Sequence, residues 1–163
     1  MFQPVLQELG QSIGDALRER EETVSVAEGS AGGLISATLL SIPGASAYYL
    51  GGSVIYTARA KRAFMGQAVP EPPGMRGATE EFACFLAESS RVQLGTTWAV
   101  GEAGAAGPPN RYGDPSGHAW FAISGPRSAT RHLMTGSDDR VENMVAFAVA
   151  ALTFFRETIL AEG

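Results

Sequence analysis

The sequence predicts an α/β protein, specifically a three-layer α/β/α domain built on a mixed sheet. Three observations favour this fold class: segments with strand and helix periodicity alternate in the first half of the chain, two strand-like segments flank a turn at Gly125 and Pro126, and a long apolar helix ends the sequence. Alternating strands and helices favour parallel pairing, whereas a hairpin adds antiparallel strands. With 163 residues, 45% of them hydrophobic, we expect one domain over residues 1–163.

The elements of the first half follow from the spacing of apolar residues and from residues that start or stop helices. Pro43 can stop a helix, and Thr57 can cap one. In chain order, the predicted elements are a helix from Phe2 to Leu17, a strand over residues 23–28, a small-residue loop over 29–33, a helix over 31–41, a strand over 47–57 and a helix over 58–66. A strand, a glycine-rich turn and a helix therefore follow one another directly.

The second half begins with a loop, because residues 67–77 hold three prolines and two glycines. Thr79 can cap the next helix, which ends at Gly95, and Cys84 is expected to be a small core residue of that helix. The remaining predicted elements are a strand over residues 96–102, a glycine- and proline-rich loop over 103–117, strands over 118–124 and 129–135, and a last helix that Asp138 caps and that continues for about six turns.

Composition excludes several classes of partner. The chain carries 17 acidic and 12 basic residues, a net charge of −5, and has no basic run, so a nucleic-acid partner is not expected. No continuous apolar stretch is as long as the roughly 18–20 residues of a membrane span, so we expect a cytoplasmic protein that does not enter a membrane. A single cysteine allows no internal disulfide, and no cluster of Cys and His indicates a metal site. We also expect a homo-oligomer.

The loop of small residues after Glu28 is the first candidate site. The two glycines at its end can bring backbone amides at a helix N-terminus close to a phosphate or an oxyanion, with the Ser30 hydroxyl beside them. Alternatively, the small residues only let the helix and the strand pack closely, and composition leaves both interpretations open. The loops after Glu28, Tyr56 and Glu102 should gather beyond the carboxyl ends of strands, where ligands bind in such sheets.

A second candidate is Lys61, which lies one turn into the predicted helix that follows Tyr56. A desolvated lysine can accept a proton from a hydroxyl nucleophile, and a tyrosine hydroxyl can orient such a pair. Alternatively, Lys61 is one of several solvated charges on a surface helix. The two histidines, His118 and His132, fall within predicted strands and are expected to be structural.

Small residues also follow the third predicted strand. Gly104, Ala105 and Gly107 keep side chains out of a space at the strand end, which suits a ligand, although a plain long loop would have the same composition.

Arg140 and Asn143 lie in the first turn of the last helix, where an arginine gains nothing from the helix dipole. Arg140 can instead hold a phosphate or a carboxylate, or it can be solvated.

Taken together, these segments resemble one known family. The stretches VAEGSAGGLISATLLSIPGASAYYLGGSVIYTARAK, GEAGAAGP and GSDDRVEN, which are distributed over nearly the whole chain, resemble the CinA C-terminal domain family. Characterised members of that family are nicotinamide mononucleotide deamidases. The first loop of the family usually reads Ala-Glu-Ser-Cys-Thr-Gly-Gly, so this chain departs from the pattern where Gly29, Ser30 and Ala31 replace Ser-Cys-Thr.

The resemblance implies hydrolysis of the nicotinamide carboxamide to nicotinic acid mononucleotide and ammonia, with no metal and no cofactor. In the family, the lysine of the Tyr…Lys segment assists a serine at the position of Gly29, and this chain has a hydroxyl one residue later. The catalytic residues that the resemblance implies are Ser30, Lys61 and Tyr56. The ligand-binding residues that it implies are Glu28, Gly29, Ala31, Gly32, Gly33, Gly104, Ala105, Gly107, Arg140 and Asn143.

Two other functions fit the same residues. A family member that has lost deamidation would keep the pocket and bind a small nucleotide-like ligand, or would act on another small substrate. A structural or interaction protein would use the glycine loops for packing or self-association.

Overall fold

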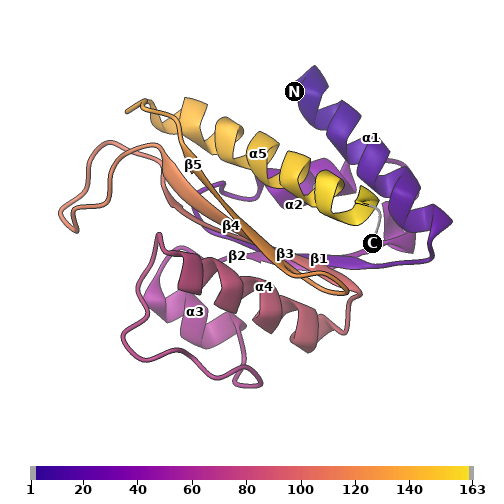
Figure 1. The fold of residues 1–163 in the computed structure, drawn as a ribbon, viewed down its shortest axis with the longest axis horizontal. Coiled ribbons are helices and arrows are strands. Elements are labelled where there is room, and N and C mark those ends of the chain that lie inside the picture. The colour runs from indigo at the N-terminus through magenta and orange to yellow at the C-terminus, as the bar shows by residue number, and fades with distance from the viewer. Residues whose placement is uncertain (1–2, 162–163) are drawn as a thin grey trace.

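A mixed sheet of five strands forms the centre of the fold. The computed structural model describes residues 3–161, and Figure 1 shows the sheet between two layers of helices. In chain order, the elements are α1 (Pro4–Glu19), β1 (Val24–Glu28), α2 (Leu34–Leu40), a 3-10 turn (Ala45–Ala47), β2 (Tyr49–Val54), α3 (Ala58–Phe64), α4 (Glu80–Leu94), β3 (Trp98–Ala105), β4 (His118–Ser124), β5 (Ala129–Met134) and α5 (Arg140–Leu160). The predicted three-layer α/β/α fold with a mixed sheet is confirmed.

The strands lie in the order β2-β1-β3-β4-β5. β1 runs parallel to both of its neighbours, with Glu28 opposite Val54 of β2 on one side and opposite Glu102 of β3 on the other. β3, β4 and β5 are antiparallel neighbours, and β4 and β5 form the predicted hairpin. Because β1, β2 and β3 are parallel, the segments that follow them leave the sheet at the same edge.

Helices cover both faces of the sheet. α1, α2 and α5 pack against one another over one face, and α3 and α4 lie on the other (Figure 1). The larger core lies beneath α1, α2 and α5, and the smaller one lies beneath α4. Large side chains that are almost fully buried in the two cores are Leu17, Trp98, Phe121, Phe147, Phe155, Ile55 and Leu86.

α5 is the long apolar helix that the sequence predicts. Its most apolar 18-residue window has a mean hydropathy of 1.4, so by length and composition alone it could cross a membrane. In the fold it packs along α1, α2 and the sheet, and Phe147, Ala151 and Phe155 have no solvent exposure. Burial in the larger core therefore accounts for the apolar composition of this helix.

The predicted helix caps are confirmed at two positions and wrong at a third. The hydroxyls of Thr57 and Thr79 accept hydrogen bonds from backbone amides in the first turns of α3 and α4. At the start of α5, the cap is Asp139 rather than Asp138, because the Asp139 carboxylate accepts the N–H of Glu142 at 2.9 Å. The helix therefore begins one residue later than the prediction requires.

Two further predictions are wrong, and a third concerns a residue that the structure does not describe. Cys84 is exposed rather than buried, because the buried side of α4 is formed by its neighbours Ala83 and Ala87. β3 continues to Ala105, beyond the predicted end at Glu102, because its last residues pair with β4 after β1 has ended. Phe2, the predicted first apolar position of α1, lies outside the described residues.

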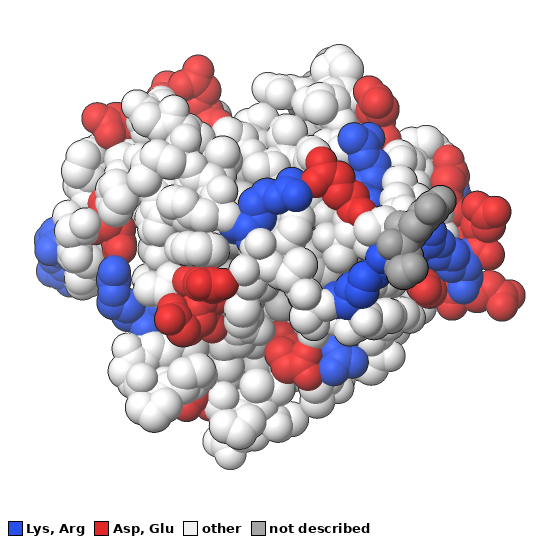
Figure 2. Space-filling view, viewed as in Figure 1, with Lys and Arg blue, Asp and Glu red and all other residues white. Residues whose placement is uncertain are grey.

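Acidic and basic side chains are interspersed on the face of the molecule shown in Figure 2. Ion pairs on the surface bring several of them together, among them Arg18 with Asp15 and Arg131 with Glu157. No broad area of a single charge sign is visible on this face.

Candidate active site

A cavity of about 730 Å³ lies at the edge of the sheet where the parallel strands end. Its walls include residues 29–30 after β1, residues 55–61 after β2, residues 75–78 before α4 with Phe82 of that helix, and residues 103–108 at the end of β3 with residues 110–114 of the loop that follows. Arg140, the first residue of α5, completes the wall. The prediction that the loops after β1, β2 and β3 gather at one edge is confirmed, and the volume is in the range of about 300–1,000 Å³ that is typical of small-molecule sites.

Ser30 lies in the wall of this cavity, and its hydrogen-bond partner is Glu102. Ser30 is only 7% exposed, and its Oγ donates to Oε1 of Glu102 at 2.5 Å. The other carboxylate oxygen, Oε2, accepts the backbone N–H groups of Gly29 and Ala31 at 2.9 Å each. One carboxylate from β3 therefore binds three consecutive residues of the loop.

Burial decides the ionisation of Glu102. The side chain has no solvent exposure, and desolvation raises its pKa to about 7, although the hydrogen bonds from Ser30, Ala31 and Gly29 oppose this rise. The carboxyl group therefore gains and loses its proton near neutral pH, in direct contact with the hydroxyl of a residue that lines the cavity.

Glu28 does not face the cavity. Its side chain is fully buried, and its carboxylate accepts the N–H groups of Gly33, Ile35 and Ser36 at 2.8–3.1 Å. Burial raises the pKa of Glu28, and these hydrogen bonds oppose the rise. The sequence predicts that backbone amides at the start of α2 can bind an anionic ligand. In the structure, these amides bind a carboxylate of the same chain instead.

The glycines of this region have different roles. Gly32 has a φ of +69°, and a Cβ there would lie 2.6 Å from Cε of Met144, so the chain is tight against α5 at this position. At Gly104 a Cβ would lie 2.7 Å from Oγ of Ser30. Close packing therefore explains Gly32, whereas Gly104 leaves the space that the Ser30 hydroxyl occupies.

The structure does not pair Lys61 with Ser30. The Lys61 amine donates to the carboxylate of Glu71, in the proline-rich loop, while Ser30 donates to Glu102. Both Lys61 and Ser30 line the cavity, so Lys61 lies at the site but not as the partner of the hydroxyl. The proline-rich loop supplies the competing carboxylate, and the sequence contained no periodic signal for where that loop would fold.

Tyr56 and Arg140 are joined at the cavity wall. Nη2 of Arg140 donates to the Tyr56 hydroxyl at 2.6 Å, and Nη1 donates to the carbonyl oxygen of Gly107 at 2.5 Å. Asn143 lies behind this wall and is almost fully buried. Its amide nitrogen donates to the carbonyl oxygen of Ala106 at 2.8 Å, so it fixes the loop after β3 and does not line the cavity.

A further basic residue, Arg76, reaches the cavity from the loop before α4. It forms an ion pair with Asp114 at 2.9 Å, and 61% of its side chain remains exposed. The two residues connect the loop before α4 to the loop after β3. Neither Arg76 nor Glu102 is among the site residues that the sequence predicts, and the signal for Glu102 is an acidic residue at the end of an otherwise apolar predicted strand.

The two histidines form a pair at the sheet. Nδ1 of His118 lies 2.6 Å from Nε2 of His132, and Nε2 of His118 lies 2.9 Å from the carbonyl oxygen of Ala78. His132 also packs against the ring of Trp120, and partial desolvation, with the nearby His118, lowers its pKa. The pair fixes the loop before α4 to β4, which agrees with the expected structural role.

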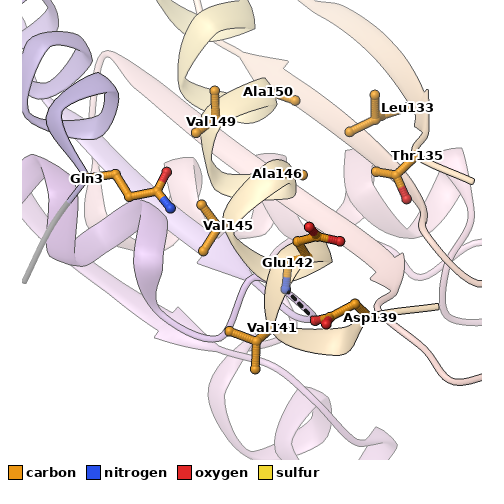
Figure 3. A pocket seen from close by; sticks show the side chains of 10 residues that line it. All are labelled: Gln3, Leu133, Thr135, Asp139, Val141, Glu142, Val145, Ala146, Val149 and Ala150. Carbon is orange, nitrogen blue, oxygen red and sulfur yellow. Dashed lines mark hydrogen bonds between the residues drawn. The ribbon is translucent and has the colours of Figure 1, made fainter. Parts of the chain in front are cut away.

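A second depression of about 690 Å³ lies along the outer side of α5, beside β5 (Figure 3). Valine and alanine side chains of α5 line it, together with Leu133 of β5 and Thr135, which follows that strand. Its two carboxylates, Asp139 and Glu142, lie at the cap of the helix. It has no arrangement of hydroxyl and base comparable to Ser30 and Glu102, so we place the candidate active site in the other cavity.

Fold and site together define an α/β domain with a cavity of about 730 Å³ and a buried serine–carboxylate pair at the carboxyl ends of its parallel strands. The family model of the CinA C-terminal domain matches residues 6–159. The chain belongs to the CinA C-terminal domain family, as the motifs in its sequence indicate.

Two curated relatives illustrate this membership. The chain is 39% identical over 150 residues to a CinA-like protein of Salinibacter ruber, and 35% identical over 136 residues to one of Myxococcus xanthus. These matches cover 90% and 81% of this chain but 36% and 32% of the relatives, so the chain spans about a third of the length of the curated relatives it matches.

The solved structures agree with the fold. The competence damage-inducible protein A of Klebsiella pneumoniae superposes with a TM-score of 0.87 at 24% identity, covering 97% of this chain and 99% of that chain. The competence/damage inducible protein of Agrobacterium tumefaciens gives a TM-score of 0.83 at 28% identity, over 95% and 96% of the two chains.

Proposed function

We propose that this chain is an amidohydrolase that deamidates nicotinamide mononucleotide, or a closely similar pyridine nucleotide, with Ser30 as the nucleophile. One observation carries the proposal: Ser30 lines a cavity that is also lined by the basic residues Lys61, Arg76 and Arg140. A hydroxyl can attack the carboxamide carbon, and cationic groups can bind the phosphate of the same substrate. The family resemblance of the Tyr56 and Lys61 segment supports this choice of substrate.

The basic residues can bind a phosphate even though each already has a partner. A guanidinium has five N–H donors. Arg76 uses one on Asp114 and is mostly exposed, and Arg140 uses two, on Tyr56 and on Gly107. Donors therefore remain on both arginines.

Ammonia release tests this function. We expect the wild-type chain to convert nicotinamide mononucleotide to nicotinic acid mononucleotide and ammonia, and Ser30→Ala to lower kcat by about 1,000-fold or more, because the nucleophile is lost. Coupled detection of ammonia and chromatography of the nucleotide measure both products. Ser12→Ala, on α1 in another layer of the fold, is the control and should keep the wild-type rate. No ammonia from the wild-type chain, or undiminished turnover by Ser30→Ala, would contradict the proposal.

A second function, nucleotide binding without hydrolysis, is favoured by the state of the loop amides. The N–H groups of Gly29 and Ala31 already donate to Glu102, so they are not free to stabilise an oxyanion. Under this alternative, titration calorimetry would detect binding of the mononucleotide while the ammonia assay stays at background.

We also propose that the protein is cytoplasmic and forms a homo-oligomer. Besides the small-molecule substrate, the proposed hydrolysis consumes only water. Light scattering after size exclusion would give the oligomeric state.

A further inference from the structure

Glu102 is the group at the site that the family resemblance does not explain. The resemblance assigns proton transfer to a lysine, but the atom in contact with the Ser30 hydroxyl is a carboxylate oxygen of Glu102. We propose that Glu102 is the general base that accepts the proton of Ser30 when Ser30 attacks an electrophile. The inference rests on the proposed function for its substrate, but the reactivity of Ser30 can be tested without that substrate.

The geometry separates the two oxygens of the carboxylate. Oε2 is held by the amides of Gly29 and Ala31, which fixes the orientation of the group, and Oε1 is left to Ser30. Glu102 is fully buried and does not line the cavity, whereas Ser30 does. A ligand in the cavity therefore meets Ser30, and the hydroxyl of this residue is bonded to the buried carboxylate. This is the order that a nucleophile and its base require.

Lys61 is placed differently. Its amine is a donor to Glu71, and none of the hydrogen bonds between described residues joins it to Ser30. Lys61 is better placed to bind an anionic part of the substrate than to receive the proton of the hydroxyl.

The proposed reaction balances with water as the one further reactant. As Ser30 Oγ bonds to the carboxamide carbon, its proton moves to Oε1 of Glu102, and the carbonyl electrons move to oxygen. When the tetrahedral intermediate collapses, the C–N bond breaks, and a water molecule in the cavity gives a proton to the departing nitrogen, which leaves as ammonia. The hydroxide that remains attacks the acyl ester, and as the acid leaves, Glu102 returns its proton to Ser30 Oγ.

The ionisation of Glu102 adds a measurable signature. Only the carboxylate can accept a proton, so the reactivity of Ser30 should increase as the pH rises through the pKa of Glu102, about 7. Among the described residues, the charge of Glu28 on the neighbouring strand also raises the pKa of Glu102.

A fluorophosphonate probe tests the assignment, because it phosphonylates an activated serine and releases fluoride. We expect peptide mass spectrometry to locate the label on Ser30 and the labelling rate to rise with pH around 7. Glu102→Gln should slow labelling about 100-fold or more, as loss of a general base does. Lys61→Met should slow it by less than about tenfold. Glu88→Gln is the matched control, since Glu88 accepts from Ser124 Oγ in a serine–glutamate pair outside the cavity and should label like wild type.

The controls keep the outcomes distinct. Circular dichroism would show whether Glu102→Gln is folded, and Glu102→Asp, which keeps a carboxylate, should label at an intermediate rate with a pH inflection. The assignment would be overturned if the wild-type chain is not labelled, or if a folded Glu102→Gln labels at the wild-type rate. It would also be overturned if Lys61→Met is slowed as much as Glu102→Gln, or if the labelling rate of Glu102→Asp shows no pH inflection. If the labelling rate depends on Glu102 but no ammonia is released, only the proposed substrate is contradicted. If ammonia release is unaffected by Glu102→Gln, only the assignment of Glu102 as the base is contradicted.

Discussion

The Ser30 hydroxyl can reach Glu102 because residue 104 has no Cβ. An added methyl at Gly104 would lie 2.7 Å from Ser30 Oγ and 2.7 Å from Cβ of Ala119. Gly104→Ala should therefore displace the hydroxyl and slow both ammonia release and fluorophosphonate labelling by about tenfold to 100-fold, since small displacements of a reacting group are costly. Gly51→Ala in β2 is the control, because its Cβ would meet only Leu94 at 3.4 Å. Equal rates for the two variants would refute this role of Gly104.

The raised pKa of Glu102 also affects the stability of the fold. Between about 4.5, the ordinary value, and about 7, the folded chain binds more protons than the unfolded chain, so the free energy of unfolding falls as pH rises through this window. At about 1.4 kcal/mol for each pH unit, the loss from this group is about 3 kcal/mol. Urea unfolding at several pH values would measure it. Glu102→Gln should flatten this dependence but not remove it, because burial raises the pKa of Glu28 as well.

At the scale of single residues, the sequence predicted which residues meet at the site better than it predicted their partners. Ser30, Tyr56, Lys61 and Arg140 all line the cavity. Hydrogen-bond partners depend on which carboxylates fold into reach, and β3 supplies Glu102 from 72 residues away in the sequence. No local spacing relates such positions.

Helix caps give a test at the scale of elements. Asp139→Ala should lower the free energy of unfolding by about 1 kcal/mol, because the N–H of Glu142 loses its acceptor. Asp138→Ala, one residue earlier, should change it by less than about 0.5 kcal/mol. Urea unfolding of both variants measures the difference, and an equal effect of the two would contradict the observed cap.

Most elements were predictable because apolar periodicity and threonine caps are local signals. The end of β3 was not predictable. Residues 103–105 are small and lack the β-branched pattern of a strand, and they are extended because β4 pairs with them. The partner strand, rather than intrinsic propensity, decides where β3 ends.

The larger core determines stability at the scale of the whole molecule. Phe147 has no solvent exposure in the core between α5 and the sheet, so Phe147→Ala should lower the free energy of unfolding by about 3–5 kcal/mol through lost burial and a cavity. Val141, on the same helix, is 70% exposed, and Val141→Ala should cost less than about 0.5 kcal/mol. Urea unfolding with equal midpoints for the two variants would be inconsistent with this core.

The three-layer architecture was predictable from the order of the elements, since the alternation of strands and helices and the final hairpin leave few arrangements of a mixed sheet. The cavity was predictable only in its location. Its walls include the loop before α4, whose prolines and glycines indicate irregular structure but not the position that brings Arg76 to Asp114.

The two buried glutamates have a consequence for the choice of compounds to test as ligands of the candidate site. A carboxylate that belongs to the chain occupies the loop amides at a high effective concentration. An added acid must displace this carboxylate before the acid can bind to the amides. Compounds designed as anionic mimics for the amides of Gly29, Ala31 or Gly33 should therefore bind weakly. Anionic compounds directed at Arg76 and Arg140, or neutral electrophiles directed at Ser30, are the better starting points for ligands of this site.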